Sequence, residues 1–149
     1  MKILLTGANG QLGCSIKEIF KDSHITVNAF SKTDLDITNK KQIALAMDEF
    51  KPNIIINAAA NTNVDNAEKY PDKAFSINYH GAKNIGMASK DYNIPLIHVS
   101  TDFVFDGDKK DGYLENDTKN PINSYGLSKH RGEEEIIGLT GELIFIFSL

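Results

Sequence analysis

Two side chains that could transfer a proton, Tyr125 and Lys129, stand four residues apart in the sequence. The surrounding stretch has helical spacing, and residues four apart project from one face of a helix. A free tyrosine titrates near pH ~10, so an adjacent ammonium that favours the phenolate would bring its proton exchange closer to neutrality. The pair predicts a proton-transfer site in which Lys129 tunes Tyr125. A half-buried tyrosine beside a solvated lysine is the structural alternative.

Two hydroxyl side chains, Ser100 and Thr101, end an apolar run that precedes this pair. In an open α/β sheet, ligands bind beyond the carboxyl ends of the strands. Thr101 could therefore reach the same site and hydrogen-bond a carbonyl oxygen. Capping of a turn is the alternative use of both hydroxyls.

A glycine pattern lies between the first strand-like run and the first helix-like run, and it reads Gly7-Ala8-Asn9-Gly10-Gln11-Leu12-Gly13. In this context it predicts a dinucleotide site. Gly7 would permit the tight turn, Gly10 would let a pyrophosphate approach the backbone, and Gly13 would let the helix lie close to the strand. The helix N-terminus then faces the phosphates. The spacing G-x-x-G-x-x-G resembles that of short-chain dehydrogenases.

The choice of dinucleotide depends on the residues after the second strand-like run. An acidic residue there would hold the ribose 2′-hydroxyl of NAD, but this chain has Ser31 and Lys32. A hydroxyl and a cation could instead accept a 2′-phosphate, which favours NADPH. NADH stays open, because Asp34 and Asp36 lie close by in the sequence.

These side chains need a scaffold in which strands and helices alternate. Apolar runs bounded by turn residues predict buried parallel strands at Lys2–Thr6, Ile25–Phe30, Asn53–Ala58, Pro95–Ser100 and Leu143–Phe147. Three- and four-residue apolar spacing predicts helices at Gln11–Lys21, Asn39–Phe50, Tyr70–Asp91 and Ser124–Leu139, with Thr38 and Ser124 as N-caps. The alternation predicts an α/β fold: a Rossmann-like, doubly wound parallel sheet with helices on both faces.

Two further segments complete this picture. Asp34–Ile37 is expected to add a short strand, which makes Leu143–Phe147 the sixth, and Phe103–Pro121 is expected to form a long surface loop. The chain stops just after the last run, with nothing left to build a pocket for a second ligand. We therefore expect residues 1–149 to be one NAD(P)-binding domain that is cut short, with the C-terminal substrate portion missing.

Composition excludes several classes of protein. With 41% hydrophobic and 24% charged residues, the chain is typical of one globular domain. A net charge of -4 and scattered Lys and Arg residues argue against a nucleic-acid partner, and the apolar runs are shorter than the roughly 20 residues of a membrane span. The single cysteine, Cys14, and the lack of a signal-peptide pattern favour the cytoplasm. The four histidines show no metal-ligand spacing, and the run Glu133–Glu135 is expected to be a solvated helix face.

Taken together, these residues resemble the dTDP-4-dehydrorhamnose reductase family of extended short-chain dehydrogenases. The similar segments run along the whole chain and are Lys2–Gly7, Asp34–Thr38, Asn57–Glu68, Ser100–Gly107 and Pro121–Glu133. The resemblance implies hydride delivery from NADPH to the 4-keto carbon of dTDP-4-dehydro-L-rhamnose, giving dTDP-L-rhamnose for surface polysaccharide.

The resemblance also implies roles for individual residues. Tyr125 would donate the proton, Lys129 would support it and bind the nicotinamide ribose, and Thr101 would orient the keto oxygen. The pyrophosphate would be held by Gly7, Gly10, Gln11, Leu12 and Gly13, the adenine would lie near Asp36 and Ile37, and the ribose and nicotinamide side would be lined by Ala58, Ala59, Ala60 and Thr62.

The chain departs from the family pattern in two places. Phe103 stands where the family usually has Tyr, and Ile146–Leu149 replaces the usual Arg-Thr-Ser-Trp. Family members continue beyond this point, and the later portion carries most contacts with the sugar nucleotide. Some relatives use Mg2+ or form homodimers, and the residues for this would fall mostly in that later portion.

Two alternatives stay open at this point. Another sugar-nucleotide epimerase or dehydratase would share the glycine loop, Tyr125 and Lys129 but act on a different substrate. A non-catalytic NADP-binding regulatory subunit would keep the fold without turnover, as does the beta subunit of methionine adenosyltransferase, which resembles this family.

Overall fold

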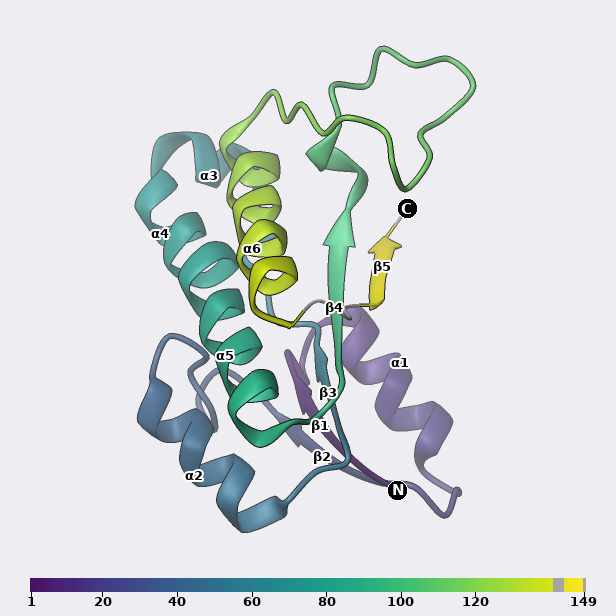
Figure 1. Ribbon diagram of the computed structural model, residues 1–149, viewed down its shortest axis with the longest axis vertical. Helices are drawn as coiled ribbons and strands as arrows, with labels where there is room; N and C mark the ends of the chain where they lie inside the picture. The colour runs from purple at the N-terminus through teal and green to yellow at the C-terminus, as the bar shows by residue number, and fades with distance from the viewer. Residues whose placement is uncertain (141–143, 149) are drawn as a thin grey trace.

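Five parallel strands form the centre of the computed structural model, which describes residues 1–140 and 144–148 (Figure 1). They are β1 (Lys2–Thr6), β2 (Thr26–Phe30), β3 (Ile54–Asn57), β4 (Leu96–Thr101) and β5 (Ile144–Ser148). Their order across the sheet is β2-β1-β3-β4-β5, and each neighbouring pair is parallel. The winding direction therefore reverses between β1 and β3, and ligands of open α/β sheets bind beyond the strand ends at such a point.

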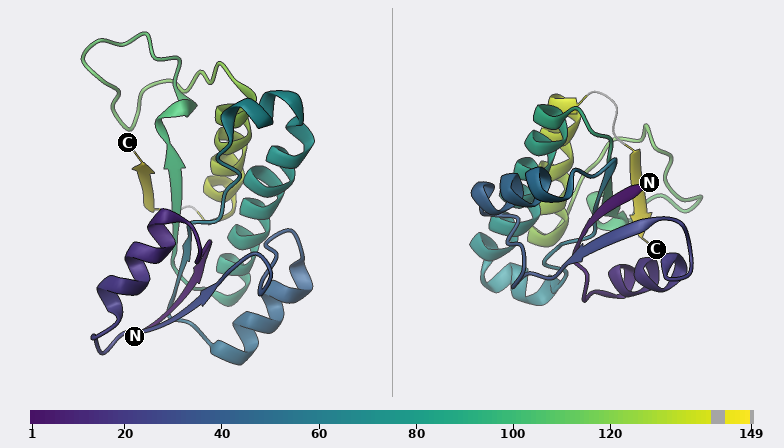
Figure 2. Two further views of the ribbon diagram at one scale, coloured as in Figure 1. Left: turned by 180° about the vertical axis from the view of Figure 1, so that it is seen from behind. Right: turned by 90° about the horizontal axis from the view of Figure 1, so that it is seen from below.

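Helices cover both faces of this sheet (Figures 1 and 2). One face carries α1 (Gln11–Phe20), and the other carries α2 (Lys40–Phe50), α5 (Ala82–Tyr92) and α6 (Ser124–Thr140). Between β3 and α5 the chain forms α3 (Val64–Lys69), α4 (Pro71–Phe75) and the π-helix η1 (Ser76–Gly81), and the 3-10 helix η2 (Asp102–Val104) follows β4. The predicted Rossmann-like, doubly wound fold is confirmed.

The core follows from the alternation of side chains along β1. Leu4 packs with the apolar residues of α2, α5 and α6 on one face, whereas Ile3 and Leu5 pack towards Ile16 and Phe20 of α1 on the other. Successive side chains of a strand point to opposite faces, so a strand covered on both sides reads as a continuous apolar run. Among the described residues, no helix is long and apolar enough to cross a membrane.

The prediction of a strand at Asp34–Ile37 was wrong. This segment curls back, because the backbone N–H groups of Asp34 and Leu35 both donate to the carbonyl oxygen of Ser31. The last run is consequently the fifth strand of the described sheet, and Leu143, the first residue of its predicted range, lies outside the described residues.

The two predicted N-caps were each wrong by one residue. Asn39, rather than Thr38, caps α2, since its side-chain oxygen accepts the N–H groups of Lys41 and Gln42. Asn123, rather than Ser124, caps α6, since its side-chain oxygen accepts the N–H of Gly126. Asparagine, like serine and threonine, is a preferred N-cap, so the residue type alone did not separate neighbours.

The helix predicted at Tyr70–Asp91 is interrupted. Pro71 begins α4, the π-helix η1 follows it, and only then does regular helix continue as α5. π-helical segments occur mostly as single turns inside α-helices and are frequent at functional sites. Apolar periodicity predicted the overall course of this segment but not the insertion.

Candidate functional site

The glycine turn after β1 is packed against its neighbours too tightly for side chains. Gly7 has a φ of +74°, and a Cβ there would lie 2.6 Å from the backbone of Ala58. A Cβ on Gly13 would lie 2.2 Å from the carbonyl oxygen of Gly7, whereas one on Gly10 would meet only that oxygen, at 3.4 Å. Gly7 and Gly13 are thus required for packing. Gly10 keeps the approach to the α1 N-terminus open.

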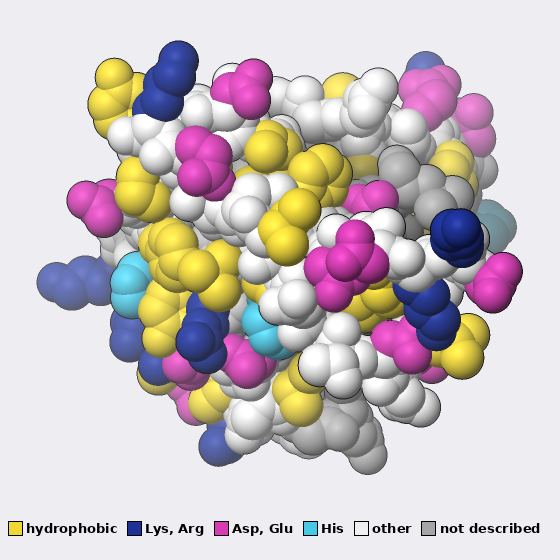
Figure 3. Space-filling model, turned by 90° about the horizontal axis from the view of Figure 1, so that it is seen from above, with side chains coloured by type: hydrophobic (Ala, Val, Ile, Leu, Met, Phe, Trp, Pro, Cys, Tyr) yellow, Lys and Arg dark blue, Asp and Glu magenta, His cyan; other side chains and the backbone are white. Residues whose placement is uncertain are grey.

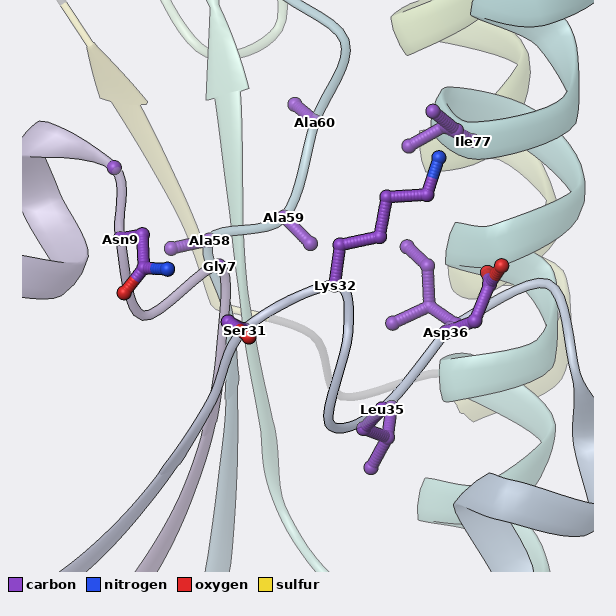
Figure 4. A pocket seen from close by; sticks show the side chains of 12 residues that line it. Gly7, Asn9, Ser31, Lys32, Leu35, Asp36, Ala58, Ala59, Ala60 and Ile77 are labelled. Carbon is purple, nitrogen blue, oxygen red and sulfur yellow. The ribbon is translucent and has the colours of Figure 1, made fainter.

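This turn forms one wall of a cleft of about 230 Å³ at the ends of the first three strands (Figure 4). The lining residues come from the ends of β1, β2 and β3 and from η1; they are Gly7, Asn9, Gly10, Ser31, Lys32, Leu35, Asp36, Ile37, Ala58, Ala59, Ala60 and Ile77. Small alanines on one side leave room for a flat ligand beside the backbone.

Most residues predicted to bind a dinucleotide meet in this cleft, but six do not line it. These are Gln11, Leu12, Gly13, Thr62, Tyr125 and Lys129. Three lining residues were missed, namely Asn9, Leu35 and Ile77. Asn9 lies inside the glycine pattern and could have been found. Ile77 had no signal, because the π-helix that carries it was not predicted.

Two ionised carboxylates lie beside the predicted 2′-phosphate site. The hydroxyl of Ser31 donates to Asp34, which holds the pKa of that carboxyl below its usual value. Asp36 accepts the backbone N–H and the hydroxyl of Thr38, and these bonds lower its pKa as well. Ser31 and Lys32 were both predicted to accept the 2′-phosphate of NADPH. Because the Ser31 hydroxyl already donates to Asp34, only Lys32 of these two could bind that phosphate.

The predicted proton-transfer residues are buried together at the ends of β4 and α6. Thr101, Tyr125 and Lys129 are 4%, 6% and 2% exposed. The ring of Phe103 lies edge-on to that of Tyr125, with centroids 5.5 Å apart. The Lys129 Nζ donates to the carbonyl oxygen of Val99 over 2.6 Å. The sequence therefore identified a trio that the fold brings close together.

The protonation behaviour of this trio differs from the prediction. Burial raises the pKa of Tyr125, and a hydrogen bond with Thr101 only partly opposes this effect. Burial also lowers the pKa of Lys129 to about 8, although Glu133 acts in the opposite direction. The net lowering of the Tyr125 pKa that was expected is not found, because removal of the phenol from water disfavours its charged form and has the largest effect.

Polar side chains behind this trio form a buried chain across the sheet. The Thr6 hydroxyl donates to Asn57, the Asn57 amide contacts His98 at 2.9 Å, and His98 lies 3.5 Å from the Nζ of Lys129. His98 and Asn57 are 1% and 0% exposed. His98, one of the four histidines without metal-ligand spacing in the sequence, thus lies next to a predicted site residue.

The interpretation of Glu133–Glu135 as a solvated face was wrong for its first member. Glu133 is fully buried, where it accepts the hydroxyl of Ser100 and pairs with Lys119 at 2.5 Å. Lys119 belongs to the long loop before α6, so this pair fastens that loop beside the trio. A helix that packs against a sheet buries one stripe, and Glu133 lies one turn beyond Lys129 on it.

Asn78 of η1 connects the cleft to α6. Its side chain accepts the N–H of Asn61 over 2.7 Å and donates to the carbonyl oxygen of Asn61 and to the hydroxyl of Ser128, each over 2.9 Å. Ser128 in turn donates to the carbonyl oxygen of Tyr125. The loop that carries the cleft alanines is thereby held at a fixed distance from the α6 trio.

The face onto which the strands end carries charges of both signs. Lys and Arg side chains are interspersed there with Asp and Glu (Figure 3). Recognition of phosphates on this face would depend on backbone amides and single cations such as Lys32. Across residues 1–140 and 144–148, no three His, Cys, Asp or Glu side chains gather where they could hold a metal ion.

A family model and related sequences both point to the same family. Residues 1–146 match the family described as RmlD substrate binding domain. The chain is 42% identical over 146 residues to the dTDP-4-dehydrorhamnose reductase of Aggregatibacter actinomycetemcomitans, a match that covers 97% of this chain and 50% of the relative.

Solved structures agree with the sequence match. A dTDP-4-dehydrorhamnose reductase from Clostridium acetobutylicum superposes with a TM-score of 0.96 at 40% identity, over 100% of this chain and 53% of that one. One from Bacillus anthracis, in complex with NADP, gives 0.94 at 41% identity, over 98% and 52%. The chain thus spans about half the length of the proteins it matches.

Proposed function

Because the chain belongs to the dTDP-4-dehydrorhamnose reductase family, we propose that it is the NADPH-binding domain of an enzyme that reduces dTDP-4-dehydro-L-rhamnose to dTDP-L-rhamnose. The observation that carries the proposal is the cleft at the glycine turn, which opens at the same strand ends as the buried trio Thr101, Tyr125 and Lys129. Residues 1–149 are proposed as one domain. The contacts with the sugar nucleotide are not assigned, since the chain spans half the length of its relatives.

The cleft fits a dinucleotide in its shape and donors. Gly7 and Gly10 leave the backbone at the α1 N-terminus accessible, where N–H groups and the helix dipole favour a pyrophosphate. In the proposal, Gln11, Leu12 and Gly13 complete this turn, and Asp36 and Ile37 flank the adenine. The alanines Ala58, Ala59 and Ala60, together with Thr62, flank the ribose and nicotinamide side.

The trio then performs the proton chemistry. When bound, the nicotinamide supplies the hydride for the 4-keto carbon. Thr101 donates a hydrogen bond that orients the keto oxygen, and Tyr125 donates its phenolic proton to that oxygen. Lys129 binds the nicotinamide ribose. Since burial raises the pKa of Tyr125, its phenol carries its proton at neutral pH, as a proton donor must.

The proposed preference for NADPH over NADH depends on Lys32. Its ammonium lies in the lining of the cleft and could pair with a 2′-phosphate, and the Bacillus anthracis structure contains NADP. The nearby carboxylates of Asp34 and Asp36 act against this preference. A homodimer and a cytoplasmic location stay predictions, and Mg2+ is not part of the proposal.

Titration of the purified chain with NADPH and with NADH, followed by fluorescence, tests the cofactor assignment. We expect a saturable signal with NADPH and weaker binding of NADH. Lys32→Met should reduce the difference in affinity between NADPH and NADH. Lys90→Met, at an exposed position on α5, should leave that difference unchanged. The absence of saturation with either cofactor contradicts the proposal.

Addition of dTDP-4-dehydro-L-rhamnose separates the alternatives. A reductase consumes NADPH in proportion to product, and Tyr125→Phe should abolish that turnover. An epimerase or dehydratase would convert a sugar nucleotide without net loss of NADPH absorbance. A regulatory subunit, or a reductase domain without the contacts with the sugar nucleotide, would bind the cofactor and turn over nothing.

A further inference from the structure

A buried path of hydrogen bonds joins the cleft to the lysine of α6. It begins at the backbone N–H of Ala59 and the hydroxyl of Thr6, which both donate to Asn57 Oδ1, at 3.3 and 2.6 Å. It continues from Asn57 to His98 Nδ1 at 2.9 Å, and from His98 Nε2 to Lys129 Nζ at 3.5 Å. The path crosses β1 and β3 at their carboxyl ends and β4 within the strand.

The orientation of the Asn57 amide is fixed by its neighbours. A backbone N–H can only donate, so the atom of Asn57 that faces the N–H of Ala59 must be the carbonyl oxygen. The amide nitrogen therefore points to His98, and both hydrogens of that nitrogen are donors. A flipped amide would put two donors against each other at Ala59.

The tautomer of His98 follows from that orientation. Nδ1 must accept from the Asn57 amide, so in the neutral ring the proton lies on Nε2. The ring is held neutral because burial, and to a smaller extent the charge of Lys129, lower the pKa of His98 well below its usual value. The Nε2–H then faces the Nζ of Lys129.

We infer that His98 is a positioning residue that acts through Lys129: its Nε2–H is held against Nζ and favours the neutral amine over the ammonium. An amine has a lone pair that this N–H can use, whereas an ammonium has only donors. The amine still donates to the carbonyl oxygen of Val99, 2.6 Å from Nζ. The sheet thus sets the protonation of the lysine through an amide that sits behind the cleft.

Other groups around Lys129 set the background for this effect. On its own helix, Glu133 raises the pKa of Lys129, but one oxygen of that carboxylate pairs with Lys119 and the other accepts the hydroxyl of Ser100. Tyr125 lies one turn earlier on the same helix. Burial outweighs Glu133 and gives a pKa of about 8, so a change at His98 would alter the protonation of Lys129 within a measurable range.

Only the catalytic role of Lys129 rests on the proposed function. The effect of His98 on the protonation of Lys129 can be tested without any cofactor. The tautomer of His98 is read from the 15N NMR signals of the imidazole in the unmodified chain. We expect the Nε2–H form between about pH 6 and 9. The Nδ1–H form, or a protonated ring, would overturn the inference whatever the outcome of the NADPH titration.

A variant tests the effect on the lysine. His98→Asn keeps an oxygen that can accept from Asn57 but removes the N–H that faces Lys129. The 13Cε signal of Lys129, assigned by its loss in Lys129→Met, should then titrate at a higher pH, by up to about one unit, which is the shift expected for the loss of one hydrogen bond. His24→Asn, at an exposed histidine, is the control and should leave the titration unchanged.

A second variant reverses the tautomer. Asn57→Asp places acceptors against both Ala59 and His98, which draws the imidazole proton to Nδ1 and leaves Nε2 as an acceptor for an ammonium. The Lys129 signal should then titrate more than one unit higher, together with a change to the Nδ1–H imidazole signals. If Asn57→Asp moves the imidazole proton while the titration of Lys129 stays unchanged, His98 does not control the lysine.

Discussion

Gly13 of α1 lies directly against the carbonyl oxygen of Gly7, so that a Cβ on Gly13 would be 2.2 Å from that oxygen. The contact fixes how closely α1 approaches the end of β1. It also separates two uses of glycine within one pattern. Gly13 is needed for the protein to fold, and Gly10, whose Cβ would have room, is needed for a ligand to approach.

Alanine at Gly13 should lower stability, whereas alanine at Gly10 should lower the affinity for NADPH. Gly13→Ala forces backbone apart and should lower the free energy of unfolding by roughly 2–3 kcal/mol in a denaturant titration. Gly10→Ala, at an extended backbone position, should change stability by less than about 1 kcal/mol but weaken NADPH binding about tenfold or more. Equal loss of stability in both variants would contradict this division.

The buried pair of Lys119 and Glu133 should matter more than an exposed pair of the same kind. Lys119→Met removes the cation that pairs directly with the buried carboxylate of Glu133, and should cost roughly 2–4 kcal/mol of unfolding free energy. Lys109→Met removes the Lys109–Asp117 pair, which is far more exposed, and should cost about 1 kcal/mol or less. Equal stability of the two variants would contradict the anchoring of the loop by Glu133.

The pKa of Lys129 predicts a pH dependence of stability. The folded chain binds this proton less tightly than the unfolded chain, with a pKa of about 8 against 10.5. The unfolding free energy due to Lys129 therefore decreases as the pH falls from about 10.5 to 8 and is level below that range. The shift corresponds to on the order of 3 kcal/mol.

Comparison with Lys129→Met isolates most of this contribution, because groups distant from Lys129 titrate alike in both proteins. The stability of the wild-type chain relative to the variant should increase between about pH 8 and 10.5. A difference that stays constant across this range would show that Lys129 has an ordinary pKa in the folded chain.

Asn78 should affect both stability and cofactor binding. Asn78→Ala removes the three hydrogen bonds that hold Asn61 and Ser128, so we expect a loss of roughly 2–4 kcal/mol and weaker NADPH binding. Asn39→Ala is the matched control, since loss of that N-cap should cost about 1 kcal/mol without a change in affinity. An unchanged affinity in Asn78→Ala would mean that the clamp does not shape the cleft.

Strand and helix periodicity was sufficient to predict the fold, because both faces of the sheet are covered and each element has a clear apolar pattern. The trio of Thr101, Tyr125 and Lys129 was also predictable, since two of its members share a helix face and the third ends a strand. Local hydrogen bonds were harder to predict: the turn at Asp34–Ile37 and the cap at Asn39 depend on which neighbour the backbone selects.

The buried polar path could not be predicted. Thr6, Asn57 and His98 lie in three strands that are far apart in sequence, and each alone has the appearance of an ordinary polar residue in a strand. Only the strand order places them in a row that ends at Lys129. Glu133 was misjudged for a similar reason, because its partners come from β4 and the long loop.

The most direct test of the account is an NMR map of backbone amide shifts in the chain during titration with NADPH. We predict saturable changes at Gly7, Gly10, Ser31 and Ala59 around the cleft, and at Tyr125 on α6. Changes confined to the groove on the opposite side of α6, lined by Tyr79 and Arg131 among others, would contradict the account, as would no saturable change at all.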